Sequence, residues 1–348
     1  MYIAERKLQM KRITFFIGNG FDINVGLATK YKNFYKYYVF KYPDDMLAKS
    51  IGENYELWSD LESGLGNYTA KVEEEKEDEF WESEERLENA LADYLQSQMK
   101  RVHIYVDMEK EIASKIQQSL LHFQNELTTE QQRIMNSMIY TLHDSITYSF
   151  VCFNYTNTLD RCVEITQKLF PEELGHHKAD NGTIYKHSLG DIIHIHGTIQ
   201  EELILGVNDI KQIANQKFQA DALYRQYLVK EETNKRFGND KIQAVQKCID
   251  SSVAICIFGM SLGATDKMWW NYICKWLHGS DKRRLIIFAK LDQNMLRITK
   301  HTLFASENIV LENLRANSGI DESEWSKIRE QIFIKFDCGL FNFKLVQN

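Results

Sequence analysis

The sequence predicts an α/β protein in which helices flank a mainly parallel β-sheet. Three features indicate this fold class. Residues 13–17 form an apolar strand that ends in a glycine turn, short apolar runs alternate with helical patterns after residue 146, and residues 53–145 show helical patterns only. We therefore expect residues 1–348 to form a single α/β domain with a large helical insertion.

The first strand, residues 13–17, is apolar except for Thr14, as expected for a strand buried on both faces of a parallel sheet. It ends at Gly18-Asn19-Gly20, and a helix is expected over residues 27–40. A strand, a glycine turn and a helix can place backbone N–H groups against a nucleotide phosphate. The third glycine of a full dinucleotide-binding fingerprint is missing, because Ile23 occupies its position. A tight turn without a ligand is therefore the alternative.

Residues 53–145 are interpreted as a helical insertion between the first and second strands. We expect a loop over residues 43–52 before the insertion. Within it we expect a helix over 53–65 and an exposed acidic run over 72–79. Apolar residues that recur on one face then indicate two longer helices. These residues are Leu87, Leu91, Tyr94 and Leu95 in the first helix, and Met108, Ile112, Ile116, Leu120, Phe123 and Leu127 in the second. A third helix is expected from residue 129 to about residue 143.

Strands and helices alternate in the second half of the chain. The expected strands are residues 147–153, 191–196, 203–207, 252–259, 284–290 and 308–312, and the expected helices are 158–170 and 265–277. Residues 209–250 are expected to form a second helical segment. This alternation is typical of a parallel sheet, whose ligands bind beyond the carboxyl ends of the strands.

The composition is that of a globular chain without a membrane-spanning segment. Of the 348 residues, 44% are apolar and 26% are charged, and the net charge of −7 disfavours a nucleic-acid partner. No apolar run reaches the roughly 18 residues of a membrane helix, and residues 1–12 lack the apolar part of a secretory signal. The six cysteines form no C-x-x-C pair. We therefore expect free thiols, no four-cysteine zinc site and a cytoplasmic location.

Polar residues stand where the predicted strands end. Asn154 follows the second strand, where its amide is suited to hold a ribose hydroxyl or a water molecule, whereas Asn157 or Thr158 is expected to cap the next helix. The third strand carries His194 and His196, which alternation would place on one face. A metal site is disfavoured, because no third ligand is close in the sequence. His196 is interpreted as a general base and His194 as a buried supporting residue.

The segment Leu205-Gly206-Val207-Asn208-Asp209 is a glycine turn after a short predicted strand. Such a segment is often an ordinary turn. Because it lies close in the sequence to His196, a role in supporting that residue is the alternative.

The buried strand at 252–259 runs into a second glycine-containing turn. Here Gly259 and Ser261 precede a helix, so that backbone N–H groups could face a phosphate or a ribose. With Gly263, the spacing also fits the nucleophile elbow of serine hydrolases. The acid and the histidine that such a site needs after the serine could be Asp266 with His278 or His301.

Taken in order, these motifs resemble those of the AbiH family of bacterial abortive-infection proteins. The motifs are Gly-Asn-Gly-Phe-Asp (18–22), Trp-Ser-Asp-Leu-Glu (58–62), Phe-Asn-Tyr-Thr (153–156), His-Ile-His-Gly-Thr (194–198), Leu-Gly-Val-Asn-Asp (205–209) and Gly-Met-Ser-Leu-Gly-x-x-Asp (259–266). The family is in turn similar to sirtuin-like NAD-binding domains, including NAD-consuming ones in anti-phage defence. The resemblance implies a Rossmann-like, sirtuin-like fold.

The resemblance also implies a role for each motif, with Asn154 and His196 as the catalytic residues. Gly18 and Gly20 would approach the NAD phosphates, and Gly259 and Ser261 would contact the adenosine ribose. The complete set of expected NAD-binding residues is Gly18, Asn19, Gly20, Phe21, Asp22, Thr156, Gly197, Asn208, Asp209, Gly259, Ser261 and Asp266. Thr156 departs from the family pattern, which has an acid at this position. The zinc module of sirtuin deacylases is absent, which disfavours deacylation.

The function implied by the resemblance is that of an anti-phage effector, an NAD glycohydrolase (NADase) that cleaves NAD to nicotinamide and ADP-ribose. Asn154 would orient the ribose or the attacking water, and His196 would be the general base. Asp22 and Glu62 are candidates for positioning the substrate, whereas Trp58 and Glu62 could equally serve helix packing. NAD would be the substrate, and no metal is expected.

Two other classes of function stay open. One is a nucleotide-binding sensor that does not hydrolyse its ligand and acts through a partner, and the other is a hydrolase centred on Ser261. A toxic NADase must be silent in a healthy cell, so we expect a phage-derived trigger or a partner protein to release it, with the helical insertion as a lid or partner surface. A homo-oligomer is compatible with the sequence, and a membrane partner is not expected.

Overall fold

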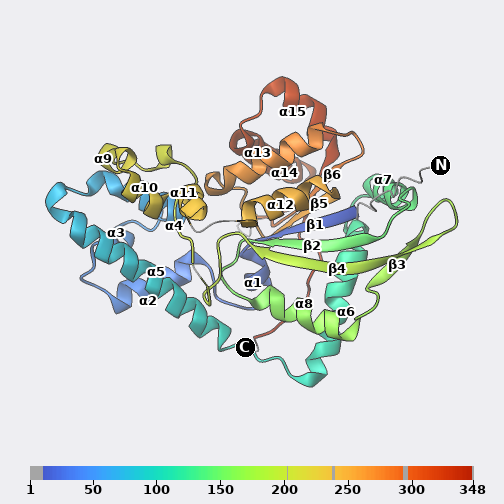
Figure 1. The fold of residues 1–348 in the computed structure, drawn as a ribbon, viewed down its shortest axis with the longest axis horizontal. Helices are drawn as coiled ribbons and strands as arrows, with labels where there is room; N and C mark the ends of the chain where they lie inside the picture. Colours follow the sequence, from blue (N-terminus) through green and yellow to red (C-terminus); the bar gives the residue numbers. More distant parts are fainter. Residues whose placement is uncertain (1–10, 202, 237–239, 293–296, 347–348) are drawn as a thin grey trace, which may run out of the picture.

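The computed structural model describes residues 11–201, 203–236, 240–292 and 297–346. Within these ranges, seven strands form one sheet in the order β3-β4-β2-β1-β5-β6-β7 (Figure 1). The strands are β1 (Lys11–Ile17), β2 (Ile146–Cys152), β3 (Gly175–Lys178), β4 (Ile184–His194), β5 (Ser252–Phe258), β6 (Arg284–Ala289) and β7 (Ile332–Phe336). Neighbouring strands pair in parallel, except that β3 pairs antiparallel with β4. The predicted α/β class with a mainly parallel sheet is confirmed.

Helices cover both faces of this sheet (Figure 1). The helices are α1 (Gly20–Asn24), α2 (Tyr31–Lys41), α3 (Met46–Glu53), α4 (Leu61–Tyr68), α5 (Glu77–Met99), α6 (Val106–Leu121), α7 (Thr129–Tyr140), α8 (Thr158–Leu169), α9 (Gln216–Ala220), α10 (Ala222–Leu228), α11 (Lys230–Arg236), α12 (Asp240–Asp250), α13 (Lys267–His278), α14 (Lys300–Ser318) and α15 (Glu322–Ile328). Side chains of α6 and α8 share a core with Phe15 of β1, whereas side chains of α12–α15 share a core with Phe16. Because neighbouring strand residues point to opposite faces, β1 is buried from both sides, as predicted. None of the helices in the described ranges is long and apolar enough to cross a membrane.

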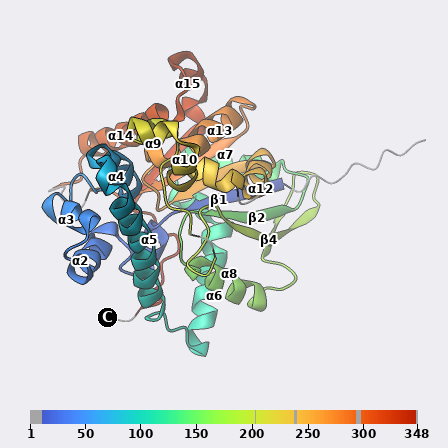
Figure 2. The same cartoon turned by 60° about the vertical axis from the view of Figure 1, so that its left-hand side comes forward.

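A third core lies beside the sheet, in what we call the helical lobe, which consists of α2–α5 and α9–α11 (Figure 1, Figure 2). Phe80 of α5 and Phe218 of α9 are fully buried there, with ring centroids 5.6 Å apart. Tyr155, which follows β2, and Val207 also belong to this core. The lobe therefore meets the sheet at the carboxyl end of β2.

The described chain between β1 and β2 contains helices and no strand. It is divided between two parts of the molecule, because α2–α5 belong to the lobe whereas α6 lies on the sheet. The apolar faces predicted for α5 and α6 are buried, as at Leu87 and Leu91 in α5 and at Ile112 and Ile116 in α6. The third predicted helix is α7, which begins with a capping box formed by Thr128 and Gln131.

The predicted loop at residues 43–52 is wrong, because α3 lies there. Its N-cap residue, Asp45, accepts hydrogen bonds from the N–H groups of Leu47 and Ala48, and Ile51 is buried one turn later. An aspartate before an apolar helical face is an N-terminal signal that outweighs the nearby Pro43.

Two predicted strands are also wrong. Residues 308–312 lie inside α14, which Thr299 caps and which ends at Gly319 in the left-handed conformation. Residues 203–207 contribute only an isolated bridge between Val207 and Val229. In both segments a short β-branched run is insufficient, because strand formation depends on a neighbouring strand to pair with.

Other differences concern boundaries. The helix expected at residues 27–40 begins at Tyr31, after the short helix α1, and β4 extends back to Ile184 and ends at His194. Strands β3 and β7 are not among the predicted strands. Of the helical segment expected at 209–250, residues 237–239 lie outside the described ranges.

Candidate functional site

The polar residues singled out in the sequence follow four strands that are neighbours in the sheet. The sheet order β4-β2-β1-β5 places the carboxyl ends of these parallel strands next to one another. Ligands of parallel sheets bind at this edge. The polar residues therefore follow strands that end at the same edge of the sheet.

Four ionisable side chains form what we call the charged cluster: Glu62, His196, Lys230 and Asp266. The ammonium of Lys230 lies 2.6 Å from Oε2 of Glu62 and 3.6 Å from Oδ1 of Asp266. Nε2 of His196 lies 3.1 Å from the same Asp266 oxygen. The four residues come from α4, the loop after β4, the first turn of α11 and the 3-10 turn Ala264–Asp266. The fold thus brings together residues that are up to 204 positions apart, from 62 to 266.

The segment 205–208 positions Lys230. The N–H of Val207 donates to the carbonyl of Leu228 at 2.8 Å, and the N–H of Lys230 donates to the carbonyl of Val207 at 3.0 Å. This close pairing requires Gly206, because a Cβ there would lie 2.5 Å from the Leu228 carbonyl oxygen. The glycine motif after His196 is therefore a support for a residue of the charged cluster.

Burial and mutual charge set the protonation of the cluster. Burial would raise the pKa of Asp266, but the charge of Lys230 and the hydrogen bond from His196 outweigh it and hold this pKa at about 2. Burial raises the pKa of Glu62 to about 7, although Lys230 opposes the shift. Burial disfavours the ammonium, yet Glu62 and Asp266 keep the pKa of Lys230 above its ordinary value. Burial and the charge of Lys230 lower the pKa of His196, so its ring is neutral near pH 7.

This arrangement leaves one nitrogen of His196 available. Nε2 of His196 faces both Oδ1 of Asp266 at 3.1 Å and the ammonium of Lys230 at 3.5 Å. The ionised Asp266 favours the neutral tautomer with its proton on Nε2, so the lone pair is on Nδ1. Nδ1 is buried and has no hydrogen-bond partner in the described structure. His196, Asn208, Lys230 and Asp266 line a cavity of about 20 Å³. A cavity of that size holds about one water molecule. The cluster can therefore accept a proton from a small group placed beside Nδ1.

His194 belongs to a different group of residues. Its Nδ1 donates to the carbonyl of Asn154 at 3.0 Å, and its Nε2 donates to Asp160 of α8 at 2.9 Å. Burial opposes protonation, yet the bond to Asp160 raises the pKa of His194 to about 11, so the ring is an imidazolium. The prediction that His194 and His196 share a face is wrong, because β4 ends at His194 and the chain turns before His196 makes its contacts.

Asn154 itself lies in a polar and buried environment next to His194. The residue is only 6% exposed, and neither the oxygen nor the nitrogen of its side-chain amide has a hydrogen-bond partner in the described structure. Nearby, Thr156 donates to Oδ2 of Asp22 at 2.6 Å, whereas Oδ1 of Asp22 is without a partner. Burial raises the pKa of Asp22 to about 6. Unpartnered polar atoms of this kind are expensive to bury, and they suit a site that accepts a polar ligand or water.

The glycines of the first and last motifs contact each other. A Cβ on Gly18 would lie 2.6 Å from the carbonyl oxygen of Gly259, and a Cβ on Gly259 would lie 2.7 Å from the Cα of Gly20. This packing of two loops accounts for all three glycines without a ligand. Their role in phosphate binding stays a prediction.

Several other predicted ligand residues have structural contacts. Phe21 is buried against Phe341, and the amide of Asn19 donates to the carbonyl of Thr29. Asp209 caps the 3-10 turn Ile210–Gln212 and forms an ion pair with Lys267. Gly197 adopts a φ of 72°, which lets the chain turn after His196.

The nucleophile elbow is not supported. Positive φ angles occur at Gly259 (73°) and Leu262 (55°), whereas an elbow concentrates this strain on the nucleophile itself. Ser261 is exposed and makes no hydrogen bond with a histidine in the described structure. The histidine that pairs with Asp266 is His196, which precedes the serine.

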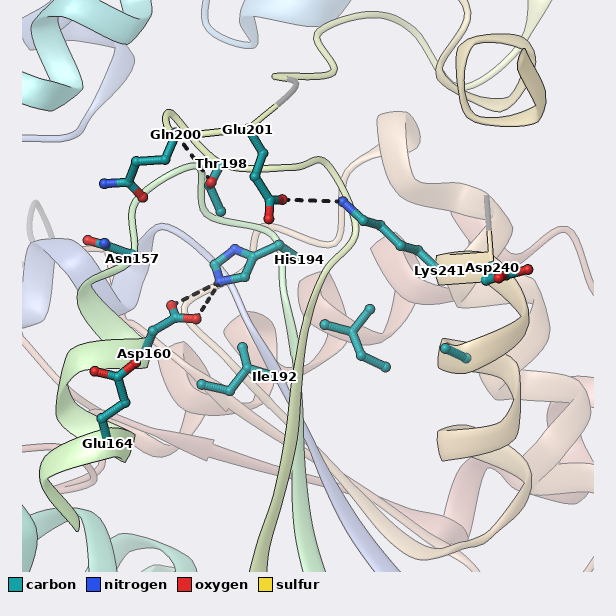
Figure 3. Close-up of a pocket in the computed structure, with 12 residues that line it drawn as sticks. Asn157, Asp160, Glu164, Ile192, His194, Thr198, Gln200, Glu201, Asp240 and Lys241 are labelled. Atoms are coloured by element: carbon teal, nitrogen blue, oxygen red, sulfur yellow. Dashed lines mark hydrogen bonds and ion pairs between the residues drawn. The ribbon is translucent and has the colours of Figure 1, made fainter. Parts of the chain in front are cut away.

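A second and larger cavity of about 560 Å³ lies beside the end of β4, between α8 and α12 (Figure 3). The ion pair of His194 and Asp160 forms one wall, and Lys241 of α12 reaches Glu201 at 3.7 Å on the other. His194, which donates to the Asn154 carbonyl, lines this cavity, whereas His196 does not.

Lys230 is the residue of the charged cluster that sequence reasoning missed. It lies in the polar, lysine-bearing segment 209–250, where nothing in the local pattern distinguishes it from a solvated lysine. In the described ranges, no group of three or more His, Cys, Asp or Glu side chains is arranged to hold a metal ion. The expectation of a metal-free site stays a prediction.

The fold and the site define an α/β protein with a buried histidine–carboxylate cluster at the carboxyl edge of its parallel sheet. The family model described as "Bacteriophage abortive infection AbiH" matches residues 14–288, which is well over half of the chain and includes every motif named above. The chain belongs to the AbiH family, and this membership implies a role in abortive infection of bacteriophage. A search of the curated proteins found no match.

Proposed function

We propose that the protein acts in abortive infection by hydrolysing NAD, with Asn154 and His196 as the catalytic residues. The observation that carries the proposal is the His196–Asp266 pair, which leaves Nδ1 of a buried, neutral histidine free to act as a base. The unpartnered amide of Asn154 offers a donor and an acceptor for a ribose hydroxyl. A Rossmann-like, sirtuin-like fold is part of this proposal.

The strand order supports a dinucleotide ligand. Its six parallel strands run β4-β2-β1-β5-β6-β7, which is the order of doubly wound dinucleotide-binding sheets when they are numbered along the chain. The order reverses between β1 and β5, and ligands of such sheets bind beyond the strand ends at that point. The loops with Gly20 and Gly259 flank it.

The proposed reaction breaks the bond between the ribose C1′ and the nicotinamide nitrogen. The electron pair of that bond leaves with nicotinamide, which becomes neutral, and the ribosyl cation is attacked by water. Nδ1 of His196 takes the proton of this water, so the products are nicotinamide, ADP-ribose and one proton. Asn154 would hold the ribose during the transfer.

In the present conformation, the space beside His196 is too small to hold NAD. A cavity of about 20 Å³ at His196 is far smaller than the several hundred Å³ of a typical ligand pocket. Lys230 and Glu231 of α11 form part of its wall, so a shift of α11 would be needed to admit NAD. The same observation favours the second candidate, a nucleotide-binding sensor that does not hydrolyse its ligand.

The proposal predicts that Asn154→Ala and His196→Ala each lower nicotinamide release by about 100-fold or more, because each removes a group that acts in the transition state. The measurement is nicotinamide release from NAD by purified protein, repeated in lysate from phage-infected cells. His143→Ala, which removes a half-exposed histidine outside the charged cluster, is the matched control and should keep full activity. Release that survives both substitutions would contradict the proposed site, and NAD binding without release in either setting would favour the sensor.

A further inference from the structure

Two carboxylates converge on one ammonium group in the charged cluster. Glu62 and Lys230 each have 7% of their side chain exposed, and Asp266 has 18%. Tyr155 donates to the other oxygen of Glu62 at 3.3 Å, so this carboxylate is held from two sides. The cluster is built to surround a positive charge away from solvent.

We propose that Glu62 and Asp266 form a binding site for a cationic group of the substrate, and that the ammonium of Lys230 fills this site in the present conformation. The identity of the ligand rests on the function proposed above. NAD carries its positive charge on the nicotinamide ring, and the ribose becomes cationic as nicotinamide departs. A pair of carboxylates beside the general base would bind the first and stabilise the second.

A buried nitrogen of the charged cluster has no hydrogen-bond partner among the described residues, which indicates a ligand. Nδ1 of His196 has no hydrogen-bond partner in the described structure, its residue is 6% exposed, and it lines the small cavity together with Lys230 and Asp266. The ammonium of Lys230 lies 3.5 Å from Nε2 of His196, so a cationic group that replaced it would lie beside the ring of the proposed base.

Lys230 and a cationic ligand group would compete for the same carboxylates. Lys230 is the first residue of α11, whereas Asp266 follows β5 and Glu62 lies on α4. A shift of α11 would therefore withdraw the ammonium and leave both carboxylates in place. Because it fills the cation site, the ammonium of Lys230 would act as a plug and keep the enzyme inactive until that shift occurs.

The test uses Lys230→Ala, which deletes a fragment equivalent to propylammonium. Propylammonium chloride should raise the thermal midpoint of this variant by about 3 °C in a saturable manner. Sodium chloride at equal ionic strength and 1-propanol, the uncharged analogue, should not. The wild type and Lys217→Ala, an exposed lysine of the same lobe, should show no specific shift.

The inference is overturned if folded Lys230→Ala shows no specific stabilisation, or if the wild type responds equally. Glu62→Gln combined with Lys230→Ala should abolish the response, because one of the two carboxylates is gone. If Lys230→Ala is insoluble in sodium chloride, it is refolded in propylammonium chloride. Recovery only in propylammonium supports the site, and failure in both salts overturns it.

Lys230→Ala also distinguishes a failure of the cation site from a failure of NAD hydrolysis. If the ammonium is a plug, Lys230→Ala should release nicotinamide without infection, at least about 10-fold faster than the wild type. Propylammonium should inhibit this release at the concentrations that stabilise the protein. Stabilisation by propylammonium without any nicotinamide release would leave the cation site standing and would contradict NAD hydrolysis.

Discussion

His194 stabilises the candidate site through its hydrogen bonds, and this role requires no contact with a ligand. Its two ring nitrogens donate to the Asn154 carbonyl and to the Asp160 carboxylate. A ring that donates from both nitrogens is positively charged, and Asp160 supplies the compensating charge. The ion pair therefore anchors the turn that carries Asn154 onto α8.

Asp160→Asn should weaken the protein most at low pH. The pKa of His194 is raised in the folded state from the ordinary 6.5 to about 11. The ion pair thus stabilises fully below pH 6.5 and loses its contribution as pH rises toward 11. We expect Asp160→Asn to lower the free energy of unfolding by about 2 kcal/mol at pH 6, measured by urea denaturation, with the difference from the wild type shrinking at pH 9 and above.

Glu164→Gln is the matched control for this measurement. Glu164 lies one turn further along α8 and lines the same cavity as Asp160 (Figure 3). Its neutralisation should leave the pH dependence of stability unchanged. A difference between wild type and Asp160→Asn that stays constant from pH 6 to pH 9 would contradict the assigned charge on His194.

Trp58 is a motif residue whose contacts in the structure are those of helix packing. Its ring packs against Gly64, where a Cβ would lie 2.6 Å from the ring, and its indole nitrogen donates to Ser50 at 3.2 Å. The motif that contains Trp58 therefore serves helix packing at its first residue and the charged cluster at its last, Glu62.

The loops after β1 and β5 act as one structural unit. Gly20 and Gly259 lie so close that a side chain on either would overlap the backbone of the other. Backbone atoms cannot move aside as the end of a flexible side chain can, so the two loops must separate if either glycine is replaced.

Gly20→Ala is therefore expected to lower the free energy of unfolding by about 3 kcal/mol, measured by chemical denaturation. Gly263→Ala, in the same loop as Gly259, is the control. A Cβ there would meet its nearest atom at an ordinary 3.5 Å, and its effect should stay within about 0.5 kcal/mol. Equal stability of Gly20→Ala and the wild type would contradict the close packing of the loops.

Helices and buried parallel strands were largely predictable, because their signals are local. The apolar face of α5 and the continuous apolar run of β5 are both contained in short stretches of chain. Residues 308–312 also contain a short apolar run but lie in α14, because the Thr299 cap and the helical sequence on both sides outweigh a short β-prone run. The edge strands β3 and β7 are short and only partly buried, so their patterns are weak.

Of the three cores in the described ranges, two lie on the faces of the sheet and one lies in the helical lobe, and the candidate site lies between the lobe and the sheet. The lobe core includes Phe80, and the sheet core beneath α6 includes Phe123, both of which are completely buried. The charged cluster joins Glu62 and Lys230, from helices of the lobe, to His196 and Asp266, which follow β4 and β5. Any motion of the lobe relative to the sheet would therefore change the site.

Phe80→Ala should destabilise the lobe by about 3–4 kcal/mol, because it leaves a large cavity among Tyr68, Trp81 and Phe218. Native-state hydrogen exchange should report faster exchange in α2–α5 with little change in β1 and β5. Phe123→Ala is the matched control and should accelerate exchange around α6 and β1 instead. Uniform acceleration by both variants would show that lobe and sheet unfold as a single unit.

The sequence determined the α/β class and indicated that polar residues such as Asn154 and His196 follow the buried strands, because apolar runs and the polar residues after them are local signals. Only the folded structure assigned Asp266 to His196, separated His194 from His196 and brought Lys230 between Glu62 and Asp266. These contacts join residues that are far apart in the sequence. Their energies depend on burial and on distances of a few ångströms, which no local pattern encodes.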